Sequence, residues 1–298
     1  MRRLTGVQAA IIDGHTHAFS PDLVRDRQTY LRHDLWFEHL YTDSRALLTT
    51  GEDLLTSMDA AGIGQAVVCG FPWRDLGIAR DQNDYLADVA ARSRGRLAWL
   101  GIVPPRIGPP AEAEVARCLD LGAAGFGEFN ADAQGFDLHD VSAWRAVLDR
   151  CHATGCPILL HATEPVGHEY RGKGTATPDR LVPFLAAFPE LNVVLAHWGG
   201  GLPFYELMPE VAAVTARVVY DTAASTYLYR PQIFRTVLDL VGPERVLWGS
   251  DYPVLRQDRF LQRTMNAGLR AEEVEWVMAG TAARLYRMPI LKPMEIDE

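Results

Sequence analysis

Two histidines at alternate positions, His15 and His17, are the first residues of this chain whose types and spacing could do chemistry. They follow a short apolar run at residues 9–12, within the stretch Asp13-Gly14-His15-Thr16-His17. Successive side chains of an extended strand alternate between its two faces, so Asp13, His15 and His17 should point the same way. Two imidazoles on one face could bind a divalent metal, but they could equally have a structural role as hydrogen-bonded side chains. Further ligands must come from elsewhere in the chain.

Eight short runs of β-branched and aliphatic residues, bounded by Gly, Pro or Asp, are the elements that would position such ligands. Runs of this composition are typical of strands buried on both faces. They cover residues 9–17, 65–71, 97–103, 123–129, 157–161, 192–197, 218–221 and 245–250. Segments of helical period separate them. The alternation predicts a closed parallel (β/α)8 TIM barrel, an α/β fold built by residues 1–298 as a single domain.

Local signals predict where helices begin and where a long connection lies. Ser142 is expected to cap a helix that ends at Gly155, Pro110 to open another, and Thr177-Pro178 a third. Residues 18–50 are expected to form a long loop between the first strand and the first helix of the barrel. Such a loop would be either a lid over the site or an ordinary connection that covers the end of the barrel.

Metal-binding side chains stand at the ends of several runs. Glu128 is near the end of the fourth run, His161 ends the fifth, His197 ends the sixth, and Asp251 follows the eighth. Barrels of this class keep their chemistry at the carboxyl ends of the strands. Imidazole nitrogen and carboxylate oxygen are suitable ligands for zinc and similar ions. The remaining histidines are expected in surface or packing roles; they are His33, His39, His139, His152 and His168.

Four motifs together resemble the amidohydrolase superfamily. They are the Asp13-to-His17 stretch, the lone His161, His197-Trp198-Gly199-Gly200-Gly201 and Gly249-Ser250-Asp251-Tyr252-Pro253. More narrowly, they are similar to its amidohydrolase-related branch, which contains decarboxylases like aminocarboxymuconate semialdehyde decarboxylase. The ending Gly280-Thr281-Ala282-Ala283-Arg284-Leu285-Tyr286 resembles that branch too. The resemblance covers residues 11–286 and is specific to the branch, not to a substrate.

The resemblance implies a metal site. His15, His17, His161 and Asp251 would hold one divalent ion, with zinc expected and a water completing the site. His197 would be either a catalytic histidine or a ligand of a second ion. Glu128 stands where many superfamily members carry a carboxylated lysine that bridges two metals. It is either a ligand, which would allow two ions, or a residue that orients a ligand.

Three functional hypotheses follow: two are enzymatic, and the third is a non-catalytic scaffold. The first is a metal-dependent hydrolase that cleaves a C–O or C–N bond of a lactone, ester or amide through a metal-activated water, with Asp251 as proton shuttle and His197 assisting. The alternative is a non-oxidative decarboxylase of a small unsaturated or aromatic acid. A scaffold that has lost catalysis is opposed by the complete ligand set. Candidate cations for a substrate carboxylate are Arg74, Arg106, Arg171 and Lys173.

Composition limits the partners. The chain has 29 Lys and Arg against 38 Asp and Glu, a formal charge of −9, which opposes nucleic acid and a TatD-like nuclease function. Its four cysteines lack CxxC pairs and are expected to be buried, reduced thiols. No segment is long enough to span a bilayer. We therefore expect a cytoplasmic protein with a small-molecule substrate and no nucleic-acid or membrane partner; the sequence leaves a homodimer open.

Overall fold

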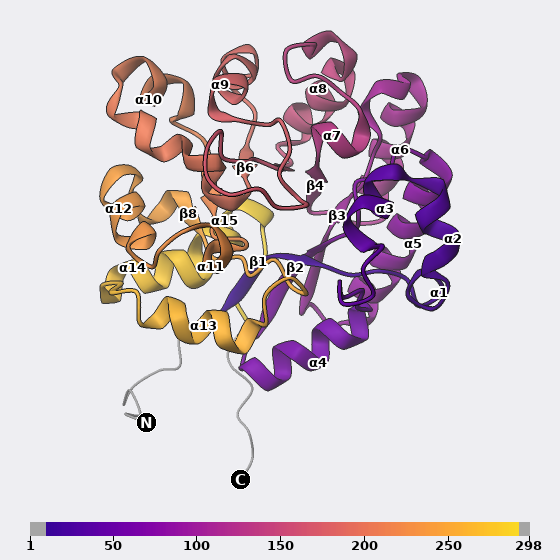
Figure 1. The fold of residues 1–298 in the computed structure, drawn as a ribbon, viewed down its shortest axis with the longest axis horizontal. Helices are drawn as coiled ribbons and strands as arrows, with labels where there is room; N and C mark the ends of the chain where they lie inside the picture. The colour runs from indigo at the N-terminus through magenta and orange to yellow at the C-terminus, as the bar shows by residue number, and fades with distance from the viewer. Residues whose placement is uncertain (1–9, 292–298) are drawn as a thin grey trace.

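The structure, a computed structural model, describes residues 10–291, and its centre is a ring of eight parallel strands (Figure 1). The strands are β1 Ile12–His17, β2 Gln65–Cys69, β3 Leu97–Gly101, β4 Gly125–Phe129, β5 Ile158–Leu160, β6 Val193–Leu195, β7 Val219–Asp221 and β8 Val246–Leu247. Each strand is hydrogen-bonded to the next in chain order. The ring closes where the Gly14 N–H donates to the Trp248 carbonyl at 2.8 Å and Thr16 bridges Tyr252. The expected (β/α)8 barrel is confirmed.

The strands follow the predicted order but are shorter than the predicted runs. Residue 9 of the first predicted run lies outside the described residues. β5 ends at Leu160 and β6 at Leu195, so His161 and His197 lie just beyond the strands. The chain leaves the ladder at these carboxyl ends because it turns there into the loops that carry polar side chains.

Helices surround the strands on the outside (Figure 1). The longer ones are α4 Gly51–Ala61, α5 Leu76–Arg92, α6 Pro109–Asp120, α8 Arg145–Thr154, α9 Pro178–Ala187, α10 Pro209–Thr215, α12 Gln232–Val241 and α13 Gln257–Met265. Shorter ones are α7 Ala131–Gln134, α11 Ser225–Leu228, α14 Ala271–Glu275 and α15 Thr281–Tyr286.

The predicted helix starts are partly correct. Thr177 is the N-cap residue of α9 and Pro178 stands in its first turn, as predicted. α6 begins one residue before Pro110. Ser142 does not cap α8, because its hydroxyl donates to Asp140 at 2.7 Å within a short 3-10 turn that precedes the helix.

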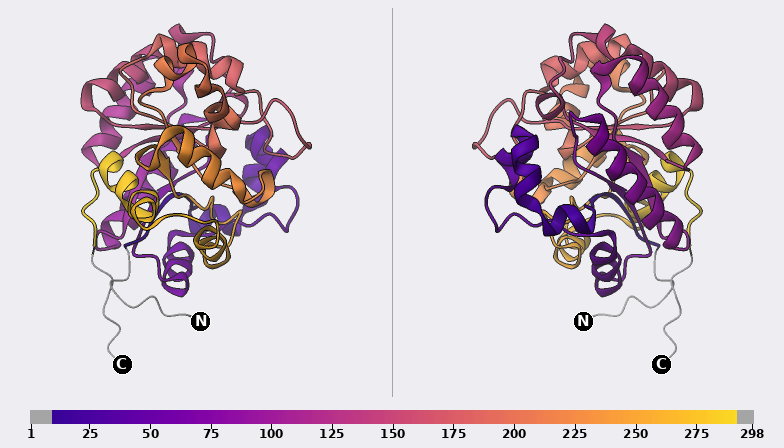
Figure 2. Two further views of the ribbon diagram at one scale, coloured as in Figure 1. Left: turned by 90° about the vertical axis from the view of Figure 1, so that its left-hand side faces the viewer. Right: turned by 90° about the vertical axis from the view of Figure 1, so that its right-hand side faces the viewer.

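The connection between β1 and α4 is helical, so the expectation of a loop over residues 18–50 is wrong. It contains α1 Pro21–Arg25, α2 Arg27–His33 and α3 Leu35–Tyr41. The Asp34 carboxylate caps α3 by accepting from two of its first backbone N–H groups. Phe37 of α3 then packs against Phe71 and Trp73, with ring centroids 5.1 and 4.9 Å apart. Figure 2 shows these helices at the same end of the barrel as the segment between β5 and α9.

The core has two layers. Side chains such as Val67, Leu100 and Leu247 fill the inside of the barrel, and a larger apolar layer lies between the strands and the helices. Cys69, Cys118, Cys151 and Cys156 are buried and unpaired, as expected. Within residues 10–291, no helix combines the length and the hydrophobicity that a bilayer crossing requires.

Glu114 on α6 is a fully buried carboxylate that ties α6 to α5. It accepts hydrogen bonds from Asn83, Arg80 and Arg117. Burial alone would raise the pKa of Glu114, but these donors outweigh it and lower the pKa to about 2. A carboxylate with a lowered folded-state pKa stabilises the fold above its unfolded-state pKa and loses that effect as the pH falls through the folded-state value.

We therefore expect Glu114→Gln to lower the free energy of unfolding by about 2 kcal/mol at pH 7, because the charged hydrogen bonds are lost. Urea titrations should show this difference shrinking as the pH falls from about 4.5 toward about 2. A difference that stays constant over that range would contradict the assignment.

Candidate metal centre

His15 and His17 lie on the same face of β1, as predicted, with their Nε2 atoms 3.1 Å apart. Gly14, between Asp13 and His15, is required by packing, because a Cβ there would lie 2.2 Å from the Cδ2 atom of Leu247. The strand register relative to β2 shifts between Asp13 and Thr16. This local geometry brings the two imidazoles together at the carboxyl end of β1.

Asp13 does not join them. Its carboxylate accepts from the Ser250 hydroxyl at 2.6 Å, the Ser250 N–H at 2.8 Å and the Gln257 side chain at 2.7 Å. Burial raises the pKa of Asp13 to about 6, against the opposing effect of these donors. Asp13 therefore ties β1 to the segment after β8, which carries Asp251.

The outer nitrogens of both β1 histidines face oxygens that accept hydrogen bonds, and His17 Nδ1 also lies 3.4 Å from the Cys69 Sγ atom. His15 Nδ1 lies 2.7 Å from an oxygen of Asp221, at the end of β7, and His17 Nδ1 lies 3.3 Å from the Gly70 carbonyl. When each neutral imidazole donates to its oxygen from Nδ1, its Nε2 presents a lone pair. Two lone pairs 3.1 Å apart repel each other unless a proton or a cation lies between them.

The other two histidines show the same arrangement. His161 Nε2 lies 3.0 Å from the Gly172 carbonyl, and His197 Nδ1 lies 3.2 Å from the Ala223 carbonyl. When these carbonyls accept the hydrogen of a neutral imidazole, it lies on the outer nitrogen. The inner nitrogens, Nδ1 of His161 and Nε2 of His197, are therefore also free to bind a cation.

All four inner nitrogens converge on the Glu128 carboxylate at the end of β4. Glu128 Oε2 lies 3.7 Å from Nε2 of both His15 and His17. Glu128 Oε1 lies 2.9 Å from His161 Nδ1 and 3.5 Å from His197 Nε2. This carboxylate thus stands between two pairs of imidazoles.

Asp251 completes the cluster from the segment after β8. Its Oδ1 atom lies 3.4 Å from His17 Nε2, and its Oδ2 atom lies 4.0 Å from His197 Nδ1. Burial alone would raise the pKa of Asp251, but its contact with His17 and the charges of the neighbouring imidazoles lower it. Asp251 is therefore held as a carboxylate.

The electrostatics of the cluster call for positive charge. Glu128, Asp221 and Asp251 are all at least 94% buried, and among residues 10–291 no arginine or lysine forms an ion pair with them. Burial alone would lower the pKa of His15, but the Asp221 charge raises it well above its usual value. A divalent cation among the inner nitrogens would balance these carboxylates, so the donor set fits a metal ion.

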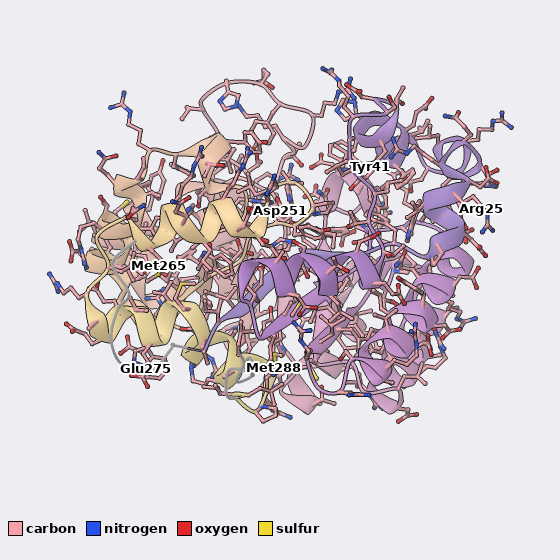
Figure 3. All side chains as sticks on the ribbon, turned by 90° about the horizontal axis from the view of Figure 1, so that it is seen from below. Arg25, Tyr41, Asp251, Met265, Glu275 and Met288 are labelled. Atoms are coloured by element: carbon pink, nitrogen blue, oxygen red, sulfur yellow. The ribbon has the colours of Figure 1, made fainter. Side chains whose placement is uncertain are left out.

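A cavity of about 640 Å³ opens over the cluster. Its floor contains His17, Glu128, His161, His197 and Asp251. Its aromatic lining comes from Trp36, Tyr41, Phe71, Tyr170 and Tyr227. Figure 3 shows Tyr41 on α3 and Asp251 beyond β8 toward one end of the barrel, with Met288 at the opposite end. The shape and lining suit a small planar molecule.

The structure changes the roles expected for several other residues. His168, expected at the surface or in packing, lines the cavity, as does Arg171. Arg74 and Arg106 instead hydrogen-bond to backbone carbonyls near α7, and Lys173 pairs with Glu169 at 3.1 Å.

Sequence reasoning missed Asp221 and Asn130. Asp221 holds His15 Nδ1 and accepts from the His197 N–H at 2.8 Å, and Asn130 lines the cavity. Asp221 ends the seventh predicted run, the position that singled out the other ligands, so that signal was available. Asn130 lies one residue beyond the fourth predicted run, so its position gave no such signal.

Comparisons with known proteins agree with this geometry. A family model described as amidohydrolase matches residues 12–288. A 2-amino-3-carboxymuconate-6-semialdehyde decarboxylase from Dictyostelium discoideum is 23% identical over 61% of this chain and 58% of that protein. A gamma-resorcylate decarboxylase from Rhizobium radiobacter is 25% identical over 80% of this chain and 86% of that protein.

Among solved structures, a 5-carboxyvanillate decarboxylase variant from Novosphingobium aromaticivorans, with bound manganese and 3-methoxy-4-hydroxy-5-nitrobenzoic acid, has a TM-score of 0.75. It is 18% identical, covering 94% of this chain and 97% of that chain. The relatives described here are named as decarboxylases. The comparisons therefore favour the alternative of the sequence analysis over its first hypothesis, hydrolysis.

Proposed function

The chain belongs to the amidohydrolase family, and from this premise we propose that it is a metal-dependent, non-oxidative decarboxylase of a small aromatic or unsaturated acid. One observation carries the proposal: four imidazole nitrogens and two carboxylates converge beneath an aromatic-lined cavity. The names of the relatives supply the reaction class.

We assign the metal ligands as His15, His17, His161 and Asp251, with Glu128 as a further ligand. The manganese in the Novosphingobium structure supports a divalent ion, and manganese and zinc are both to be tested. The alternative is a second ion, which Glu128, His161 and His197 would hold, because Glu128 faces both pairs of imidazoles. Metal content per chain separates the two assignments.

The cation would supply Lewis-acid polarisation of the substrate carboxylate and a neighbouring oxygen. The protein side chains do the rest. Asp251, a carboxylate in the free site, would take up a proton from solvent and deliver it to the carbon that loses the carboxylate. The bond between that carbon and the carboxyl carbon breaks, its electron pair takes up the proton, and carbon dioxide leaves. Asp251 is thereby returned to its carboxylate form.

His197 is assigned to hold the negative charge that develops on the substrate. Burial alone would lower the pKa of His197, but Glu128 and Asp251 raise it to about 9. A protonated imidazole at this place on the cavity floor would donate a hydrogen bond to a substrate oxygen.

Removal of the metal tests this proposal. Protein loaded with manganese or zinc is incubated with gamma-resorcylate, 5-carboxyvanillate and 2-amino-3-carboxymuconate-6-semialdehyde, and with lactones, esters and amides. We expect carbon dioxide release from an acid, loss of at least about 99% of the rate after chelation, and recovery when metal is restored. Hydrolysis of a lactone, ester or amide without carbon dioxide release would contradict the decarboxylase assignment.

A further inference from the structure

Asn130 lies between β4 and α7, two residues after Glu128, and its side chain has a fixed orientation. Its Oδ1 atom accepts from the backbone N–H groups of Asp132 and Ala133, both at 3.0 Å, and so caps α7. Only the carbonyl oxygen of the amide can accept two N–H groups, which excludes the flipped amide. The Nδ2 group must therefore point away from the start of α7.

The Asn130 Nδ2 group has no acceptor among residues 10–291, although the side chain is 4% exposed. This nitrogen is not among the buried polar atoms that lack a partner, so it keeps contact with open space. Asn130 lines the cavity over the metal centre together with Glu128. An N–H donor held in this position, with neither protein acceptor nor enclosure, is available to a ligand in the cavity.

A neutral hydrogen-bond donor beside the two carboxylates would favour the binding of an anionic substrate. The floor carries the Glu128 and Asp251 carboxylates, which repel the oxygens of an anionic substrate. The amide N–H attracts such an oxygen without adding a charge that would pair with either carboxylate. Because the cap fixes the amide, little conformational entropy is lost when the ligand binds.

We infer that Asn130 positions the substrate by donating a hydrogen bond from Nδ2 to an anionic oxygen of the bound acid. The inference rests on the proposed function, since it takes the ligand to be a small carboxylic acid. It gives Asn130 a role in substrate binding that is separate from the sequence motifs and from the assigned metal ligands.

Two substitutions at this position separate the donor from the cap. Asn, Asp and Ser are about equally good N-cap residues. Asn130→Ser should keep the thermal midpoint and the metal content of wild type but raise KM, and the Kd by calorimetry, for gamma-resorcylate about 10- to 100-fold. Asn130→Asp should raise Kd further for gamma-resorcylate than for resorcinol, because only the former carries a carboxylate.

Controls guard against a purely structural role. Asn130→Ala loses both the cap and the donor, so its thermal midpoint should fall while its Kd matches that of Asn130→Ser. Thr50→Ala removes the N-cap side chain of α4, a helix that does not line the cavity, and should lower stability without changing Kd.

The outcomes are distinct. A raised Kd in Asn130→Ser with unchanged stability supports the inference. An unchanged Kd in Asn130→Ser overturns it and leaves the proposed function standing. Failure of the metal-loaded wild type to bind gamma-resorcylate, 5-carboxyvanillate or 2-amino-3-carboxymuconate-6-semialdehyde overturns the proposed function, and this inference with it.

Discussion

Replacing His15 and His17 together with alanine is expected to remove the divalent cation and to lower the decarboxylation rate by about 10⁴-fold. The two Nε2 atoms lie 3.1 Å apart and face Glu128 Oε2, so no other pair of described residues replaces them at that position. Lewis-acid stabilisation of developing charge is worth several kcal/mol, and about 5.5 kcal/mol corresponds to this factor. Elemental analysis of the purified variant, beside the rate of carbon dioxide release, provides the measurement.

The matched control is His152→Ala, because His152 is an exposed histidine on α8 outside the cavity. It should keep the metal content and the rate of wild type. Circular dichroism of the double variant should show an intact fold, since both rings are replaced by smaller side chains. Stoichiometric metal in a folded His15→Ala, His17→Ala protein would contradict the assigned ligand set.

The second large effect is expected from His197→Asn, which should lower kcat about 10²- to 10⁴-fold with little change in KM, because a proton-bearing group is lost from the reacting centre. Asparagine is the appropriate replacement, since His197 has a left-handed backbone with a φ of 56° that asparagine tolerates. Its shorter side chain does not reach Glu128 as the imidazole does.

Metal content decides how that result is interpreted. If one ion per chain remains in His197→Asn, as in wild type, the loss of rate belongs to the histidine itself. A drop from two ions to one would instead make His197 a ligand and contradict the catalytic assignment. His139→Asn, at an exposed position outside the cavity, should leave both kcat and metal content unchanged.

The sequence determined the barrel and the residues that gather at its rim. Strands such as β2 and β3 can be predicted from their own residues. Their apolar runs are typical of strands that are buried between the barrel interior and a layer of helices. The alternation of side chains along β1 was likewise sufficient to place His15 and His17 on one face. Parallel strands present their carboxyl ends together, which brought His161, His197 and Asp251 to the same place.

The tertiary structure alone decided how those residues work together. His15 and Asp221 are 206 positions apart, and their contact exists only because the strands close into a ring. The hydrogen-bond partners that direct the inner nitrogens of His17 and His161 toward Glu128 are backbone carbonyls, which leave no signature in residue type. Periodicity reports the face of a strand, whereas the direction of a lone pair depends on contacts between distant segments.

The same distinction applies to the walls of the cavity. Helices α1, α2 and α3 are too short to give a strong periodic signal, and they are stabilised by contacts such as that between Phe37 and Trp73. Asn130 is an ordinary N-cap residue in the sequence, and only the packed cavity exposes its amide to a ligand. The sequence by itself therefore determined the fold and the residue types of the candidate metal centre. The tertiary structure decided their orientation and the surface that meets the substrate, because both depend on long-range contacts.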